Sequence, residues 1–137
     1  MDFSANCTCG NISVKLNLPN SIEKYQLRKC DCDFCLSHDI VYLSDQLGVL
    51  DIFPNNQLRT MRQGSEQAEF KQCLNCGQVI AATSRIENEM RGAVNAQLLV
   101  MKYSLSDPIT VSPKLLSADE KRRRWSEMWL KVILNDA

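Results

Sequence analysis

The seven cysteines are the residues of this chain whose type and spacing are best suited to chemistry, and they form three clusters. A C-x-C-G motif lies at residues 7–10, a C-x-C-x-x-C motif at residues 30–35 and a C-x-x-C-G motif at residues 73–77. No cysteine lies outside these motifs. Reduced thiols at such spacings converge readily on a soft cation, for which Zn²⁺ is the commonest candidate. The pattern therefore predicts zinc binding.

Disulfide bonding is the competing explanation, and two observations speak against it. An odd number of cysteines leaves one thiol over if all the others pair. The chain also opens with M-D-F-S-A-N, which has neither the basic start nor the apolar run of a signal peptide. We therefore expect a cytoplasmic protein whose thiols stay reduced.

Seven thiol ligands divide into four plus three, which predicts two zinc ions per chain. A structural zinc is closed by four protein ligands, whereas a reactive zinc keeps three and leaves one position open. The knuckle of Cys73 and Cys76 can be completed by Cys7 and Cys9, because residues i and i+2 of an extended segment point to the same side. Three ligands then remain for a second site: Cys30, Cys32 and Cys35. Spacing alone leaves open a pairing of Cys7 and Cys9 with this second cluster instead.

The order and spacing of the three motifs resemble those of the glutathione-dependent formaldehyde-activating enzyme family, which also includes centromere protein V. The V-N-A-Q-L segment at residues 94–98 matches as well, and the resemblance covers about residues 5–105. It implies a β-tent fold of stacked antiparallel sheets. It also implies a structural zinc on the positions of Cys7, Cys9, Cys73 and Cys76, and a second zinc on those of Cys30, Cys32 and Cys35.

The activity that this resemblance implies is that of a carbon–sulfur lyase acting on thiol–aldehyde adducts such as S-hydroxymethylglutathione. An open three-cysteine zinc can accept a thiol and lower its pKa, and the resulting thiolate adds to an aldehyde carbonyl. Cys30, Cys32 and Cys35 would then act catalytically through the second zinc, with a small thiol such as glutathione and an aldehyde as partners. The alternative is a zinc-stabilised binding module without catalysis, since fold alone does not decide function.

His38 is the only histidine, and it follows Cys35 at a metal-ligand spacing. Three interpretations remain open for it. It could close the second site as a fourth ligand, or it could act as a general base beside an open zinc. It could also be an ordinary exposed or hydrogen-bonded histidine.

The composition favours one zinc-binding domain over residues 1–137. This length suits a single core, and 45% hydrophobic with 23% charged residues is typical of a soluble globular protein. Sixteen basic residues balance sixteen acidic ones, so no overall field attracts the chain to nucleic acid or a membrane. No segment approaches the roughly 20 apolar residues of a membrane span.

The hydrophobic pattern predicts a mainly β protein. Apolar and polar residues alternate with period two over residues 12–18, which is typical of a half-buried strand. Further strands are expected at residues 40–43, 48–52, 58–63, 67–72, 78–83 and 93–99, with a turn at Gly64 and Ser65. Several short strands with turns between them favour a sandwich-like architecture, which agrees with the implied tent.

The C-terminal segment has a different pattern and predicts a helix over about residues 118–133. An S-x-x-E capping box begins at Ser117. Apolar residues follow at i, i+3, i+4, i+7 and i+8, namely Trp125, Met128, Trp129, Val132 and Ile133. We expect this stripe to pack on the domain, and the alternative is a homodimer or partner surface built on the two tryptophans.

A basic run at residues 121–124 lies on the same predicted helix. Lys121 and Arg122 flank the apolar stripe, where their stems can lie along it. Arg123 and Arg124 are expected to point well away from it. A solvated helix face is therefore favoured over a nucleic-acid contact.

Overall fold

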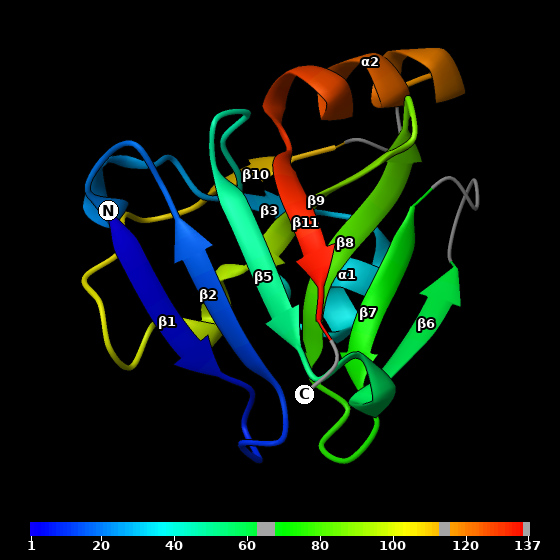
Figure 1. The fold of residues 1–137 in the computed structure, drawn as a ribbon. Coiled ribbons are helices and arrows are strands. Elements are labelled where there is room, and N and C mark those ends of the chain that lie inside the picture. Colours follow the sequence, from blue (N-terminus) through cyan, green and yellow to red (C-terminus); the bar gives the residue numbers. More distant parts are fainter. Residues whose placement is uncertain (63–67, 113–115, 136–137) are drawn as a thin grey trace.

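The computed structural model describes residues 1–62, 68–112 and 116–135, and it is mainly β with a C-terminal helix (Figure 1). The turn expected at Gly64 and Ser65 lies outside the described residues. The strands are β1 (Asp2–Asn6), β2 (Ser13–Asn17), β3 (Arg28–Cys30), β4 (Tyr42–Leu43), β5 (Val49–Phe53), β6 (Leu58–Arg62), β7 (Glu69–Cys73), β8 (Val79–Ile86), β9 (Glu89–Asn95), β10 (Ile109–Val111) and β11 (Leu130–Leu134). The helices are α1 (Asp33–Ser37) and α2 (Ala118–Met128), with short 3₁₀ turns at Ile22–Lys24, Asn55–Gln57 and Ala96–Leu98.

All the described strands belong to one mixed sheet, which branches at β9. One path runs in the order β1-β2-β5-β11-β9-β4-β3-β10, and β8, β7 and β6 follow from the other edge of β9. Most pairs are antiparallel, but β11 is parallel to β5 and β10 is parallel to β3. Figure 1 shows β3 and β10 behind β5 and β11, so the sheet folds over and encloses the core.

Gly92 makes the branching at β9 possible, because atoms of β8 and β11 approach its backbone closely. A Cβ atom at this position would lie 2.6 Å from the carbonyl oxygen of Ala82 and 2.8 Å from Cγ2 of Val132. Such distances are well inside van der Waals contact, so the site needs a residue without a side chain. Gly92 therefore allows β8 and β11 to pair with opposite edges of β9.

The main hydrophobic core confirms the alternation in the first predicted strand. Ile12, Val14, Leu16 and Leu18 are at most 1% exposed, whereas Lys15 and Asn17 face solvent. Burying each such aliphatic side chain stabilises the fold by about 1.5–3 kcal/mol. A second, smaller core surrounds the second cysteine cluster and contains Cys30, Cys35, Ile40, Phe70, Val79 and Ala82.

The strands predicted at residues 40–43, 48–52, 58–63, 67–72, 78–83 and 93–99 overlap β4, β5, β6, β7, β8 and β9, with shifted ends. Residues 63 and 67 lie outside the described residues, and residues 96–98 form a 3₁₀ turn where a strand was predicted. Four of the described strands lie outside these ranges and residues 12–18: β1, β3, β10 and β11. β1 and β10 are short edge strands with weak apolar patterns, and they are held by backbone pairing with β2 and β3.

The prediction of a helix to residue 133 is wrong at its C-terminal end. The helix starts as expected at the capping box, where the Glu120 amide and the Ser117 hydroxyl lie 3.2 Å apart. It stops at Met128, because the chain turns extended at Trp129 and continues as β11. Leu130 and Val132 are buried there between β5 and β9. Tertiary pairing of a segment containing β-branched residues thus overrides the helical stripe.

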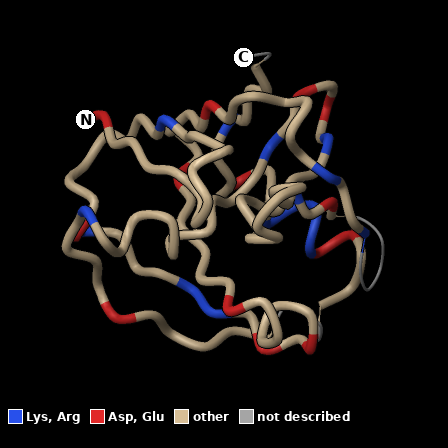
Figure 2. The backbone as a smooth tube through the Cα atoms, turned by 90° about the horizontal axis from the view of Figure 1, so that it is seen from below, with Lys and Arg blue, Asp and Glu red and all other residues tan. Residues whose placement is uncertain are grey.

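Charges of both signs are interspersed along the backbone, as Figure 2 shows. This agrees with the equal numbers of basic and acidic residues in the sequence. Among the described helices, none combines the length and the apolar character that crossing a membrane requires.

Candidate metal centres

The first cysteine cluster brings together residues from two hairpins. Cys7 and Cys9 lie in the turn from β1 to β2, Cys73 ends β7, and Cys76 lies in the turn to β8. Their four Sγ atoms lie within 4.8 Å of one another, with 3.6 Å between Cys9 and both Cys7 and Cys73. Tetrahedral zinc with thiolates at about 2.3 Å places its sulfurs roughly 3.8 Å apart. The four thiols therefore fit a closed zinc site, and Cys7 and Cys9 belong to it and not to the second cluster.

Local backbone structure explains why these four thiols converge. Gly10 and Gly77 both adopt positive φ, and their amides donate to the carbonyl oxygens of Cys7 and Cys73. Each C-x-C-G or C-x-x-C-G motif is thereby folded into a tight turn. The Gln78 side-chain oxygen accepts from both the amide and the hydroxyl of Thr8, at 2.8 and 2.9 Å. This contact joins the two turns directly.

The second cluster consists of Cys30, Cys32 and Cys35, whose Sγ atoms also lie within 4.8 Å of one another. Cys30 ends β3, Cys32 is the N-cap of α1, and Cys35 lies inside that helix. The Cys32 sulfur accepts from the Cys35 amide at 3.4 Å, which starts the short helix and turns both side chains to the same side. Three thiols in this arrangement fit a zinc ion and leave room for one further ligand.

Tyr42 is a member of this site that the sequence did not single out. Its hydroxyl lies 3.1 Å from the Cys35 sulfur. Burial, and then the negative charge of Cys35, raise the pKa of Tyr42 well above its usual value. The hydroxyl therefore stays protonated and donates to the Cys35 sulfur when the latter is a thiolate. The sequence offered only a weak signal for Tyr42. A tyrosine in a buried strand needs a hydrogen-bond partner for its hydroxyl, but the sequence does not say which residue that is.

Each cluster holds one thiol that ionises easily beside one that does not. Hydrogen bonding from Cys35 lowers the pKa of Cys30 to about 6, while the same contact and burial raise that of Cys35. The Asn75 side chain lowers the pKa of Cys9 to about 6, and burial raises that of Cys7 to about 12. Thiols that share protons in this way are suited to exchange those protons for a metal ion.

A cavity of about 660 Å³ opens onto the second cluster. This volume lies within the range of about 300–1,000 Å³ that is usual for small-molecule sites. The cavity is lined by all three cysteines of the cluster together with Arg28, Asp33, Phe34, Tyr42, Ser44, Ala68, Phe70, Ala82, Ala93, Val111, Ser112, Leu116, Lys121, Arg124, Trp125, Met128 and Trp129. None of the four thiols of the first cluster is among these lining residues. Of the two clusters, the second is thus the one that adjoins this cavity.

Helix α2 and the residue that follows it form one side of this cavity. The lining positions are spaced at i, i+3, i+4, i+7 and i+8, namely Lys121, Arg124, Trp125, Met128 and Trp129. The prediction that Arg124 points well away from the apolar stripe is wrong, because Arg124, although exposed, lines the same cavity as Trp125 and Met128. The rings of Trp125 and Trp129 stack at 4.6 Å with an angle of 12° between their planes.

His38 lies apart from the clustered sulfur atoms. It caps the C-terminus of α1, and its ring stacks on Phe34 at 4.2 Å. Its Nδ1 lies 3.0 Å from the Phe34 carbonyl oxygen and 3.1 Å from the Ser37 hydroxyl. Among the described residues, neither the potential ligand group around Cys30, Cys32 and Cys35 nor the lining of the cavity includes it.

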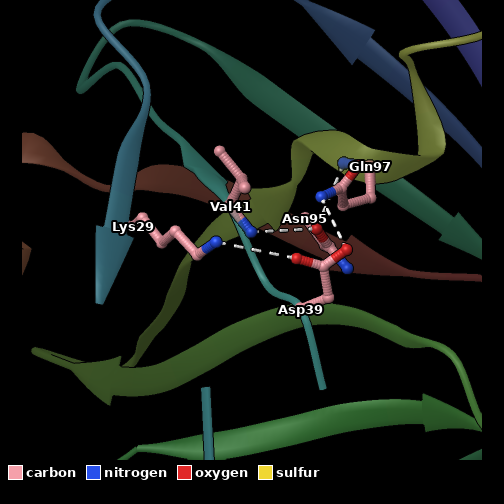
Figure 3. Close-up of polar contacts among 5 residues, drawn as sticks. All are labelled: Lys29, Asp39, Val41, Asn95 and Gln97. Carbon is pink, nitrogen blue, oxygen red and sulfur yellow. Dashed lines mark hydrogen bonds and ion pairs between the residues drawn. The ribbon is translucent and has the colours of Figure 1, made fainter. Parts of the chain in front are cut away.

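Asn95 and Gln97 of the V-N-A-Q-L segment make polar contacts with Val41 and Asp39, which follow the second cluster in the chain (Figure 3). The fully buried Asn95 accepts from the Val41 and Gln97 amides and donates to the Val79 carbonyl oxygen at 2.8 Å. Val41 immediately precedes Tyr42, so Asn95 fixes the strand that carries the cluster's hydroxyl partner. Gln97 also donates to Asp39, whose carboxylate lies 3.9 Å from Lys29.

Comparison with known proteins gives a likeness of fold. No protein-family profile and no curated protein matches the chain. A crystal structure of a Rhodobacter sphaeroides protein, a Northeast Structural Genomics target, matches with a TM-score of 0.55 and 19% identity. The match covers 77% of this chain and 100% of that one. At this identity it shows the fold alone: the chain is a mainly β protein of similar architecture, with two cysteine clusters able to hold metal.

Proposed function

We propose that this protein is a zinc-dependent carbon–sulfur lyase of the glutathione-dependent formaldehyde-activating type. Its substrates would be thiol–aldehyde adducts such as S-hydroxymethylglutathione. The order of the cysteine motifs and the V-N-A-Q-L segment support membership of that family. The observation that carries the proposal is the convergence of Cys30, Cys32 and Cys35 on the wall of a 660 Å³ cavity. A cluster with three thiols and an adjoining cavity has both a position and a space for a small thiol.

The residues divide into a structural and a reactive set. Cys7, Cys9, Cys73 and Cys76 would hold one zinc and tie two hairpins together, while Cys30, Cys32 and Cys35 would hold the other. When bound at the second cluster, zinc supplies a Lewis acid that lowers the pKa of an incoming thiol. Tyr42 orients the Cys35 sulfur through its hydroxyl and thereby fixes the ligand geometry.

The reaction needs no oxidant, reductant or further co-reactant. In the synthetic direction the thiol sulfur bonds to the aldehyde carbon, the carbonyl π bond breaks, and the thiol proton ends on oxygen. In the lyase direction the hydroxyl loses its proton, the carbonyl forms again and the carbon–sulfur bond breaks. Arg28 lines the cavity and can bind a substrate carboxylate, whereas Lys29 is engaged with Asp39 and is not a lining residue.

Exchange NMR with ¹³C-formaldehyde and glutathione tests this function. Zinc-loaded wild-type protein is expected to accelerate exchange between free formaldehyde and the adduct beyond the spontaneous rate. Cys32→Ser should lose the acceleration, and His38→Ala, which changes a residue outside the cavity lining, should keep it. If folded, fully zinc-loaded wild type gives only the spontaneous rate, the enzyme proposal fails and a zinc-stabilised binding module remains.

A further inference from the structure

We propose that α2 makes the cavity selective for ligands that combine a flat apolar body with an anionic group. At the site of the proposed function, which this inference extends, the preferred thiols would be aromatic or otherwise flat apolar mercapto acids. The binding preference itself depends only on the cavity and α2, and not on sulfur chemistry. Helix α2 also lies outside the segment of about residues 5–105 that carries the family resemblance.

The aromatic walls of the cavity favour a flat apolar ligand. The stacked rings of Trp125 and Trp129 lie on the α2 side of the cavity. Phe34 and Phe70 also line it, with ring centroids 4.5 Å apart. No described residue of α2 is buried, although the helix lies over the domain. Its inner apolar face therefore still has surface that a flat ligand can cover, with stacking on the aromatic rings.

The preference for an anionic group comes from three cations that line the same cavity: Arg28, Lys121 and Arg124. None of the ion pairs among the described residues includes any of them. Asp33 is the one carboxylate in the described lining, so positive charge is in excess there. Glu120, one turn before Arg124, is held in the capping box by Ser117. A carboxylate in the cavity would therefore gain charge-assisted hydrogen bonds that a neutral ligand cannot make.

The placement of these groups favours one ligand with both features. Lys121 lies one turn before Trp125, and Arg124 lies one turn before Met128, on the side of α2 that lines the cavity. A ligand whose ring lies against the tryptophans can thus present its acidic end to the cations. Small neutral thiols would use neither feature, although they could still reach the cysteines.

A series of sulfur-free ligands tests the preference in the full-length, zinc-loaded protein. The probes are 3-phenylpropionate, its neutral amide 3-phenylpropanamide, and propionate, which lacks the ring. Trp125 and Trp129 are the only tryptophans of the chain and both line the cavity, so intrinsic tryptophan fluorescence reports on this site. We expect 3-phenylpropionate to bind at least about tenfold more tightly than either other probe, the ratio that one charge-assisted contact gives.

A matched pair of double variants tests whether Lys121 and Arg124 cause the preference for the acid over the amide. Lys121→Gln/Arg124→Gln removes two positive charges from the cavity lining, while Arg122→Gln/Arg123→Gln removes two from exposed positions of the same helix. The first variant should lose most of the preference for the acid over the amide, since Arg28 is then the one cation left in the described lining. The second should keep the wild-type ratio. Circular dichroism verifies that α2 persists in both.

Three results would overturn the inference. They are equal affinities of wild type for acid and amide, no binding of the acid at millimolar concentration, and an equal loss in both double variants. A fourth such result is a preference for the acid over the amide that Lys121→Gln/Arg124→Gln leaves unchanged, because the anion would then be bound by Arg28 or the metal and not by α2. Because these probes contain no sulfur, their failure leaves thiol binding and lyase activity untouched. Conversely, the preference can hold in a protein that fails the exchange assay, so the two failures are distinguishable.

Discussion

At the scale of single residues, the hydroxyl of Tyr42 is the contact that distinguishes the second cluster from the first. It lies 3.1 Å from the Cys35 sulfur inside the smaller core. Hydrogen bonds that orient metal ligands are usually worth 10–100-fold in metal affinity when they are removed. Tyr42 is therefore expected to control how firmly the second metal is held.

Tyr42→Phe should lower zinc affinity at the second cluster by about 10–100-fold and leave the first cluster unchanged. The phenylalanine ring fills the same space, so the fold should persist. Competition with a chromophoric chelator measures both sites. A variant with two wild-type affinities would show that the hydroxyl does not act on Cys35.

Asn95 holds the backbone near the second cluster in place through hydrogen bonds. Its side chain satisfies the amides of Val41 and Gln97 and the carbonyl of Val79 in a fully buried place. Asn95→Ala leaves these groups without a partner and should cost roughly 2–4 kcal/mol of unfolding free energy. Chemical denaturation measures the loss.

Asp39→Asn is the matched control for Asn95→Ala in the same network. It keeps an acceptor for Gln97 and a residue suited to the positive φ of position 39. It removes only an exposed charge at 3.9 Å from Lys29, so it should change stability by less than about 1 kcal/mol. Equal losses in the two variants would contradict the role assigned to Asn95.

The sequence predicted the metal-ligating cysteines better than the residues that surround them. The cysteine spacing indicated two ligand groups but left open which of them Cys7 and Cys9 join. The family resemblance implied Cys7, Cys9, Cys73 and Cys76 beside Cys30, Cys32 and Cys35, and the structure brings these two sets together. The sequence could not identify Tyr42 or the cavity, because both depend on which strands pair. The register of β4 with β9, which brings Tyr42 opposite Asn95, has no local sequence signal.

At the scale of elements, β9 is the strand on which the architecture depends. β8 pairs with one edge, and β11 and β4 share the other. Atoms of β8 and β11 approach the backbone closely at Gly92. The branch determines where β4 and α2 lie, and therefore where the cavity forms.

Gly92→Ala should destabilise the protein by about 3 kcal/mol, because the new methyl group would overlap backbone and side-chain atoms of two neighbouring strands. Glu89→Ala on the same strand removes an exposed side chain with one ion pair to Arg91, and it should cost less than about 1 kcal/mol. Thermal denaturation of the two variants provides the comparison. A Gly92→Ala protein as stable as Glu89→Ala would refute the close approach.

The C-terminal segment shows where an element cannot be predicted from periodicity alone. Trp125, Met128 and Trp129 do share a face, as the helical stripe predicts. Val132 fits that stripe equally well but lies in β11, because β5 and β9 leave a strand position open between them. A local pattern of a few residues carries no information on whether a distant part of the sheet needs another strand.

At the scale of the whole molecule, the two clusters contribute differently to stability. The first joins the β1–β2 turn to the β7–β8 turn, more than sixty residues away in sequence. The second joins residues within one six-residue segment. Metal binding at the first cluster is therefore coupled to folding of the chain, whereas binding at the second is mainly local.

Cys73→Ser should therefore produce an unstable or aggregating protein, and Cys32→Ser should remain folded with one zinc bound. The two substitutions are chemically identical, so each serves as the control for the other. Circular dichroism and metal analysis after gel filtration provide the measurements. If Cys32→Ser unfolds the chain as fully as Cys73→Ser, the second cluster is structural.

The overall class of the fold was predictable, but its enclosure of a cavity was not. Alternation over residues 12–18 and several short apolar runs predicted a mainly β protein, and the buried faces of β2 and β5 agree. The cavity arises from α2 lying over the second cluster, at the other end of the sequence. Such long-range packing leaves no periodic signature in the chain.

The most direct test of the account is anomalous diffraction at the zinc edge, from crystals of the zinc-loaded protein grown with a thiol such as glutathione. Two zinc ions per chain are expected. One should be bound by Cys7, Cys9, Cys73 and Cys76, and the other by Cys30, Cys32 and Cys35 with a ligand sulfur reaching it from the cavity. A single ion, or a second ion closed by a fourth protein ligand such as His38, would contradict it.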